Sequence, residues 1–485
     1  MDWILFTELA VMLVCIWLGS RSGGISLGFW GGVGLVVLAF VFREAPAEPP
    51  IDVMLIILAV TCATATMQAA GGIDFLVTIA QAIIKKYPSR ITFVAPLVSY
   101  IFTFAAGTGH ILYPLLPVIH DTALRNGIRP ERPMTVSVVA SLQGITASPV
   151  SAAMAALIVI VEPLGFSLHH ILMIAVPSTI IGVLASAAVM MKWGKELEDD
   201  PEFQRRVASG EVEDIPALVK IQRLSKREKI SMDEAMGRLG IDPSVLSAAV
   251  AEGHAKASAV SDAVARENGA RAGSGKMTTF IFLFSVVLVV VLAAVPSWRP
   301  LDADGKPISV AITIQFIMLS AAALMCVLTK VKVKAIVDSA IAKTGLVALV
   351  GIFGLAWLGL TVIEANEETI VAGLKEMVTV YPWTFAIAVF ACSILLFSQA
   401  STTRTLFPLG VTLGLGAPAL TAMWPAVNGA FFLPTYGTIV AALNFDRTGT
   451  TKIGKLVLNH SFMVPGLVAV VAAVTAGFGI SAWVG

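Results

Sequence analysis

Two short polar stretches interrupt apolar runs of this sequence and carry groups suited to binding an anion. The first is AAGTGH, residues 105–110, and the second is SQASTTRT, residues 398–405. If a half-helix begins at each stretch, its free backbone N–H groups and the positive end of its dipole favour a bound anion. We therefore expect the two stretches to face one cavity that receives a small anionic substrate.

The first stretch combines backbone freedom with two hydrogen-bonding side chains. Gly107 and Gly109 allow a sharp turn and a close approach of the backbone to a ligand. Thr108 adds a hydroxyl, and His110 could donate to a carboxylate or take up a proton near neutral pH. The alternative is that His110 is a hydrogen-bonded structural histidine.

The second stretch places Arg404 in an apolar run, where a guanidinium costs several kcal/mol unless it is paired or hydrated. No Asp or Glu accompanies it at that depth, so we expect a substrate carboxylate to accept two parallel N–H bonds from it. Backbone N–H groups and the hydroxyls of Thr108, Ser401, Thr402 and Thr403 would hold the other carboxylate, with His110 as a further candidate. The alternative is an arginine that caps carbonyl groups or reaches the membrane surface.

Glycine and proline also interrupt two long apolar runs, at 141–151 and at 427–438. Proline removes a backbone hydrogen bond and disfavours helix at the residue before it. The polar residues expected to line these gaps are Gln143, Thr146, Ser148, Asn428, Thr435 and Thr438. Unwound carbonyls there could hold Na⁺ near Thr108, Gln143, Thr402 and Asn428. The alternative is that the hydroxyls only satisfy the interrupted backbone.

Membrane-spanning helices must position these groups, because 57% of the 485 residues are hydrophobic, 13% are charged and the mean hydropathy is +0.86. Runs of about 20 apolar residues fit helices that cross the bilayer, and the alternation typical of a β-barrel is absent. The net charge of +1 argues against a nucleic-acid partner. The expected spans are 3–19, 25–42, 52–70, 133–162, 168–191, 277–296, 309–329, 344–363, 417–443 and 456–482.

Internal repetition predicts an all-α polytopic protein made of two inverted repeats. The segments 91–120 and 383–417 fit re-entrant hairpins, and 133–162 and 417–443 fit broken helices. The hairpins align at an offset of 294 and the broken helices at an offset of 285. We expect a first repeat over 1–191 and a second over 277–485. Each has five crossings, which makes the repeats antiparallel, as in many secondary transporters.

The distribution of Lys and Arg predicts the orientation in the membrane. Short loops on one side hold 14 such residues and those on the other side hold four, so we expect both termini to be periplasmic. Residues 192–276 are polar and become rich in Ala, Gly and Ser. They are predicted to form a cytoplasmic linker, partly helical and partly mobile, which could also dock an unknown regulatory partner.

The sequence resembles the Dcu family of anaerobic C4-dicarboxylate transporters over nearly the whole chain outside 192–276. The resemblance is carried by GTGHILYPLLPVIHD (107–121), IRPERPMTVS (128–137), QGITASPVS (143–151), SQASTTRTLFPLG (398–410), MWPAVNGAFFLPTYGT (423–438) and FDRTGTTKIGKLVLNHSF (445–462). It implies a carrier of the bacterial inner membrane that exchanges fumarate, malate or aspartate against succinate. A more distant similarity to the ion-transporter superfamily implies a homodimer and an elevator-type mechanism. The linker departs from the family in length and composition.

Other functions stay open at this stage. The chain could couple dicarboxylate uptake to Na⁺ or H⁺, or it could be an anion channel. An intramembrane enzyme would need a second base or a carboxylate beside His110, and none is found, so we expect no enzyme and no bound cofactor.

Overall fold

The structure is a computed structural model that describes most of the chain. The described residues are 3–22, 25–241, 272–366, 368–369, 378, 380–396, 398–433, 436–454 and 459–484. Within these residues all regular secondary-structure elements are helices. β-structure is limited to two isolated bridges, Leu301 with Pro307 and Ile453 with His460. The all-α class is therefore confirmed.

Helices follow one another along both halves of the chain, and η1 and η7 among them are π-helical. The first half contains α1 (Trp3–Ser22), α2 (Ser26–Val37), η1 (Leu38–Phe42), α3 (Ile51–Ala69), α4 (Gly72–Lys86), η2 (Pro88–Arg90), α5 (Ile91–Ala106), η3 (Gly109–Leu112), α6 (Leu116–Arg125), α7 (Glu131–Ala147), α8 (Ala152–Val161), η4 (Glu162–Leu164) and α9 (Leu168–Met190). The polar segment contains η5 (Leu197–Asp199), α10 (Pro201–Ala208), α11 (Ala217–Glu228) and α12 (Met232–Leu239). The second half contains α14 (Ala272–Ala294), η6 (Pro296–Trp298), α15 (Val310–Thr329), α16 (Val333–Val337), α17 (Ala340–Gly351), η7 (Ile352–Ala356), α18 (Trp357–Ala365), α20 (Thr384–Leu396), α21 (Gln399–Thr412), α22 (Ala417–Met423), η8 (Trp424–Val427), η9 (Gly429–Phe431), α23 (Gly437–Phe445) and α24 (Met463–Val484).

Eight helical stretches of the described chain are long and apolar enough to cross a bilayer, which confirms a multi-pass membrane protein. They are Ile51–Ala69, Pro88–Ala106, Glu131–Leu164, Leu168–Met190, Ser274–Ala294, Val310–Thr329, Ala340–Ala365 and Met463–Val484. Two expected spans, 3–19 and 25–42, correspond to apolar helices below that length. The expected span 417–443 is divided into four short helices.

Helix α4 lies between the expected span 52–70 and the expected hairpin 91–120, where the sequence predicted no element. Its buried residues Ile73, Leu76, Val77, Ala80 and Ile84 recur at helical spacing, and they face α5 and α14. Such an amphipathic helix packs one face on the protein. With 15 residues, α4 is shorter than a membrane span, and polar residues such as Asp74 and Lys85 on its exposed side interrupt the apolar run.

Both expected hairpins contain a helix break near their middle. Helix α5 ends at Gly107, whose positive φ of 68° favours glycine, and the next residue, Thr108, caps η3. In the other hairpin, Ser398 caps α21 two residues after α20 ends. Whether these hairpins enter and leave by one membrane face stays a prediction.

Both broken helices resume at equivalent places in the sequence. The cap residues of α8 and α23 are Ser151 and Tyr436, which are 285 positions apart, the offset expected for these segments. The hairpin caps, Thr108 and Ser398, are 290 positions apart, not 294. Counting from its cap, the counterpart of His110 is therefore Ala400 and not Arg404, as the ungapped alignment suggested. The inverted arrangement itself stays a prediction.

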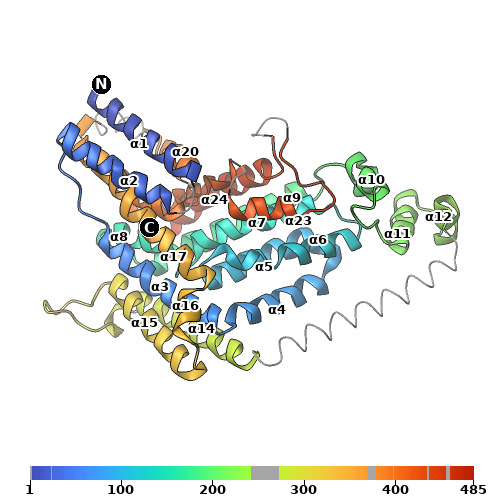
Figure 1. The fold of residues 1–485 in the computed structure, drawn as a ribbon, viewed down its shortest axis with the longest axis horizontal. Coiled ribbons are helices and arrows are strands. Elements are labelled where there is room, and N and C mark those ends of the chain that lie inside the picture. The colour runs from blue at the N-terminus through green and yellow to red at the C-terminus, as the bar shows by residue number, and fades with distance from the viewer. Residues whose placement is uncertain are drawn as a thin grey trace.

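The polar segment 192–241 forms a small helical subdomain at one end of the molecule, opposite α1, α2 and α20 (Figure 1). Ion pairs, of which Arg129–Asp200 is buried and Arg132–Glu196 is partly exposed, attach it to the membrane helices. Arg129, just before α7, donates to Glu131 at 2.5 Å and to Asp200 at 2.6 Å. Arg132 donates to Glu196 at 3.0 Å, and Glu196 also accepts from Arg223. We call these six side chains the polar anchor.

Candidate functional site

A cavity of about 760 Å³ lies where both hairpins and both broken helices meet. Its wall also includes α17 and the end of α1. The polar or aromatic residues on the wall are Trp17, Thr108, His110, Tyr113, Thr344, Ser398, Gln399, Ser401, Tyr436 and Thr438. The volume is within the range of small-molecule sites.

Four helices begin at this cavity. Gly109 starts η3, Ala152 starts α8, Gln399 starts α21 and Gly437 starts α23, and all four residues line the wall. The first N–H groups of a helix have no acceptor within that helix. The cavity therefore receives the positive ends of several helices, two from each half of the chain, which favours an anion.

The wall carries no formal charge at neutral pH apart from any proton on His110. Among the described residues that line it, there is no Asp, Glu, Lys or Arg. Tyr113 and Tyr436 are the other titratable groups there, and both are phenols that are neutral at physiological pH. A cation would find no counter-charge on this wall, whereas an anion would find backbone and hydroxyl donors.

The predicted residues Gly107, Thr108, Gly109, His110 and Ser401 all line this one cavity. A Cβ built on Gly107 would stand 2.8 Å from the carbonyl oxygen of Val150, so the hairpin tip packs closely on the first broken helix. The hydroxyl of Thr108 accepts from the backbone N–H of His110 at 3.4 Å. His110 Nε2 lies 2.9 Å from Thr344 Oγ1 on α17.

Gln143 and Asn428 lie behind the wall, in a buried cluster of amides. Asn428 donates to Gln143 Oε1 at 3.2 Å and to Thr146 Oγ1 at 2.9 Å. Gln399 donates to Asn428 Oδ1 at 2.5 Å and to the carbonyl of Leu142 at 3.0 Å. The cluster thus joins the two broken helices and the second hairpin through hydrogen bonds, as expected of polar groups that satisfy an interrupted backbone.

Three more predicted residues bond to their own segments instead of lining the cavity. Thr402 donates to the carbonyl of Ser398 at 2.8 Å. Thr403 donates to the carbonyl of Gln399 and accepts from the indole N–H of Trp424 at 3.0 Å. Ser148 accepts from the backbone of Val150 at 3.4 Å. The predicted residue Thr435 lies outside the described residues.

Arg404 is absent from the cavity wall. Its Nε is buried without a hydrogen-bond partner, and among the described residues no carboxylate lies within ion-pair distance of it. The acids that lie near enough to attract it are Asp52 and Glu364, both exposed. The guanidinium is thus half-buried on a part of α21 that does not face the cavity, and near exposed carboxylates.

Sequence reasoning did not single out Ser398, Gln399 or Thr344 as site residues. Ser398 and Gln399 lie within the quoted polar stretch, but their roles as cap and amide donor depend on where α21 begins. Thr344 is a single hydroxyl near the start of an apolar span, and no local pattern distinguishes it from the many threonines that bond to their own helix.

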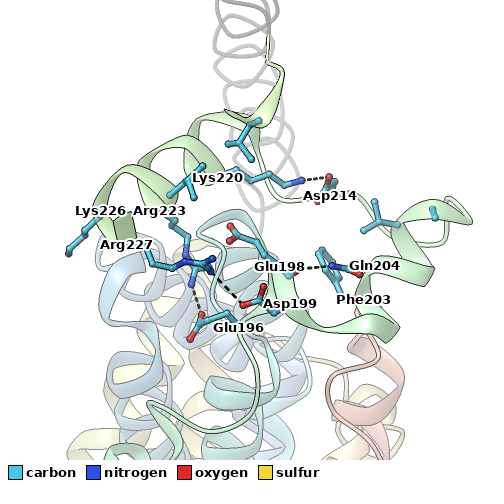
Figure 2. Close-up of a pocket in the computed structure, with 14 residues that line it drawn as sticks. Glu196, Glu198, Asp199, Phe203, Gln204, Asp214, Lys220, Arg223, Lys226 and Arg227 are labelled. Carbon is cyan, nitrogen blue, oxygen red and sulfur yellow. Dashed lines mark hydrogen bonds and ion pairs between the residues drawn. The ribbon is translucent and has the colours of Figure 1, made fainter. Parts of the chain in front are cut away.

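A second cavity of about 750 Å³ lies within the polar subdomain (Figure 2). Its wall combines apolar side chains such as Phe203 with charged groups that pair with each other, such as Lys220 with Asp214 and Arg227 with Asp199. It lies outside the apolar helices, so it is not a candidate for the transport site.

Comparison with known proteins identifies the relatives of this chain. Residues 4–485 match the family model described as anaerobic C4-dicarboxylate membrane transporter, DcuA_DcuB. The anaerobic C4-dicarboxylate transporter DcuB of Escherichia coli O6:H1 is 36% identical over 99% of this chain and 100% of its own length. The C4-dicarboxylate transporters DcuA of Escherichia coli K12 and of Wolinella succinogenes are 37% and 35% identical, each over 98% of both chains.

Proposed function

Because the chain belongs to the DcuA/DcuB family of anaerobic C4-dicarboxylate membrane transporters, we propose that it exchanges C4-dicarboxylates across a bacterial inner membrane. Fumarate, malate or aspartate would be exchanged against succinate. Membership of this family confirms that the chain is a transporter and not an enzyme. The exchange mode and the choice of substrates are the parts that we propose.

The convergence of four helix N-termini on a wall without formal charge carries this proposal. A C4-dicarboxylate has two carboxylates a few ångströms apart, and the donors come in two sets. The starts of η3 and α8 belong to the first half of the chain, and those of α21 and α23 belong to the second half. We propose that each set holds one carboxylate, aided by the hydroxyls of Thr108, Ser401 and Thr438.

Such a site favours exchange over one-way transport. With no substrate, the helix dipoles and the N–H groups that the caps leave unbonded would face the hydrocarbon during any movement across the membrane, which costs free energy. A bound dianion satisfies them, so the loaded site moves more readily than the empty one. We further propose that the movement is of the elevator type and that the protein is a homodimer.

The orientation is proposed from the distribution of Lys and Arg, with both termini periplasmic and the polar subdomain cytoplasmic. Asp52 and Glu364 then lie on the periplasmic side, with Arg404 near them. We propose that Arg404 attracts the dicarboxylate toward the cavity from that side. Direct binding by Arg404 would require a movement that brings it to the wall.

Counterflow in proteoliposomes tests the function. Vesicles preloaded with succinate should accumulate labelled fumarate, malate or aspartate, whereas vesicles loaded with a monocarboxylate such as butyrate should not. Equal accumulation with either internal acid would contradict a dicarboxylate exchanger. Flux that does not saturate and needs no internal substrate would indicate a channel.

Coupled uptake is the alternative, and it would use the polar groups near Thr108, Gln143, Thr402 and Asn428 for Na⁺ or a proton. An imposed Na⁺ or pH gradient should then drive net uptake into vesicles that contain no dicarboxylate. Exchange predicts no such net uptake.

A further inference from the structure

The imidazole of His110 is held by a helix that belongs to neither hairpin and neither broken helix. Its Nε2 lies 2.9 Å from Oγ1 of Thr344 on α17, a residue 234 positions away in the chain. Both residues line the cavity. The ring also stacks on Tyr113, with centroids 5.9 Å apart, so its orientation is set from two directions.

The hydrogen bonds of Thr344 indicate which ring nitrogen of His110 carries the hydrogen. Thr344 Oγ1 donates its one hydrogen to the carbonyl of Ala340 at 3.0 Å. A hydroxyl has a single hydrogen and two lone pairs, so toward His110 this oxygen accepts. His110 Nε2 is therefore the donor, and in the neutral ring Nδ1 is left as the unprotonated nitrogen.

No charged group on the wall competes with a bound anion for control of that ring. The described wall residues include Tyr113 and Tyr436 but no Asp, Glu, Lys or Arg. On the surrounding elements, Lys343 of α17 is exposed, and Arg404 of α21 is off the wall. Charge brought by the substrate is thus the main influence expected on the proton at Nδ1.

We propose that Thr344 is a positioning residue that makes Nδ1 of His110 the atom where a proton is taken up when a dicarboxylate binds. This proposal rests on the proposed function. The neutral imidazole accepts one proton from water, and the resulting imidazolium stabilises the dianion. One proton then binds with each substrate, and affinity falls as pH rises.

The test compares the wild type with Thr344→Val and Thr344→Ser in counterflow at several pH values between about 6.5 and 8.5, where the substrate stays a dianion. For the wild type, KM should rise with pH, by at most about tenfold for each pH unit because one proton is involved. Thr344→Val cannot accept the hydrogen bond from His110 Nε2. Its profile of KM against pH should therefore shift or flatten, with KM at neutral pH changed at least about threefold and kcat little changed. Thr344→Ser should restore the wild-type profile.

A second measurement reads the hydrogen position directly. In protein labelled with ¹⁵N-histidine, the His110 resonances, assigned by their loss in His110→Gln, should report a hydrogen on Nε2 in the wild type and in Thr344→Ser. Thr344→Val should lose that preference. A wild-type KM that is flat with pH, or a Thr344→Val profile equal to the wild type, would overturn the proposal while leaving exchange intact. Absence of any dicarboxylate exchange by the wild type would instead refute the function.

Discussion

The cavity and the polar anchor differ in how they use charge. The cavity is built to receive charge, and its described wall carries none of the four residue types that are charged at neutral pH. The anchor is built to hold two parts of the chain together, and the paired side chains of Arg129 and Asp200 are only 5% and 11% exposed. The cavity offers only the partial charges of helix starts, whereas the anchor pairs full charges with each other.

The difference follows from what each region must do. A buried ion pair stabilises an attachment only if it stays paired, because removal of one partner leaves an uncompensated charge. A transport site must bind and release its substrate, so a fixed buried charge would be left unpaired in every cycle. Helix N-termini offer partial charges that attract an anion at a smaller desolvation cost. The comparison therefore predicts that substitutions that change charge lower the stability of the protein at the anchor, whereas at the cavity they lower the rate of transport.

The largest expected effect is on stability at the anchor. Arg129→Ala removes the donor to both Glu131 and Asp200, and should cost about 3–5 kcal/mol, because two buried carboxylates lose their partner. The control is Arg205→Ala, which breaks a solvent-exposed pair with Glu202 and should lower the stability far less, because water screens exposed ion pairs. Thermal denaturation of the purified protein in detergent measures both. Equal melting temperatures for the two variants would contradict the distinction.

The next effect is on transport at the cavity. Ser401→Asp places a carboxylate on the wall, near the start of α21, where an acid suits the helix and folding should persist. Repulsion between the introduced carboxylate and a substrate carboxylate about 5–6 Å away amounts to about 3 kcal/mol at an effective dielectric constant of about 20. This corresponds to a loss of about 100-fold in the exchange rate at low substrate concentration. Ser401→Asn is the neutral control and should lose less than about tenfold. Similar rates for these two variants would show that charge on the wall is unimportant.

A smaller effect is the response of the anchor to pH. Burial raises the pKa of Asp200, but hydrogen bonds from Arg129 and from the N–H groups of Phe203 and Glu202 outweigh it, so the pKa is lowered overall. Because the folded-state pKa lies below the unfolded value of about 3.9, the stabilisation is present above that value and is lost as pH falls toward the folded-state pKa.

Hydrogen exchange of the α10 amides, corrected for intrinsic rates, measures this response. Protection should be constant from about pH 7 to 5 and should fall below about pH 4. Asp200→Asn should lower protection at neutral pH and reduce its dependence on pH. Wild-type protection that rises on acidification would refute the assigned sign.

The smallest expected effect is that of Arg404→Ala. A cation off the wall acts on an approaching dianion through a partly hydrated path, so its loss should raise KM about two- to fivefold at low salt and leave kcat unchanged. The difference between the variant and the wild type should vanish at about 1 M salt. At that concentration the ionic screening length is about 3 Å, so charges farther apart than this are shielded from each other. Complete loss of exchange by a folded variant would instead place the guanidinium in contact with the substrate and would remove the contrast with Ser401.

Local sequence was sufficient to locate the polar breaks but not to orient the residues within them. Gly107 and the run from Ser398 to Ser401 were identifiable because polar groups and glycine are rare inside apolar spans. The position of the helix start at Ser398 was not, since a run of serines and threonines offers several possible caps. A shift of a few residues rotates a side chain to another face of the helix, and this is why Arg404 was expected on the wall.

The composition and spacing of the chain by themselves determined that it is an all-α membrane protein, that its helices break at four places, and that these breaks suit an anion. The hydrophobic effect and the backbone requirements of glycine and proline act locally, so they can be read residue by residue. Only the tertiary structure decided that the four helix starts share one wall, that Gln143 and Asn428 bond to each other behind it, and that Thr344 holds His110. Those contacts join residues more than 200 positions apart, and their geometry depends on how whole helices pack.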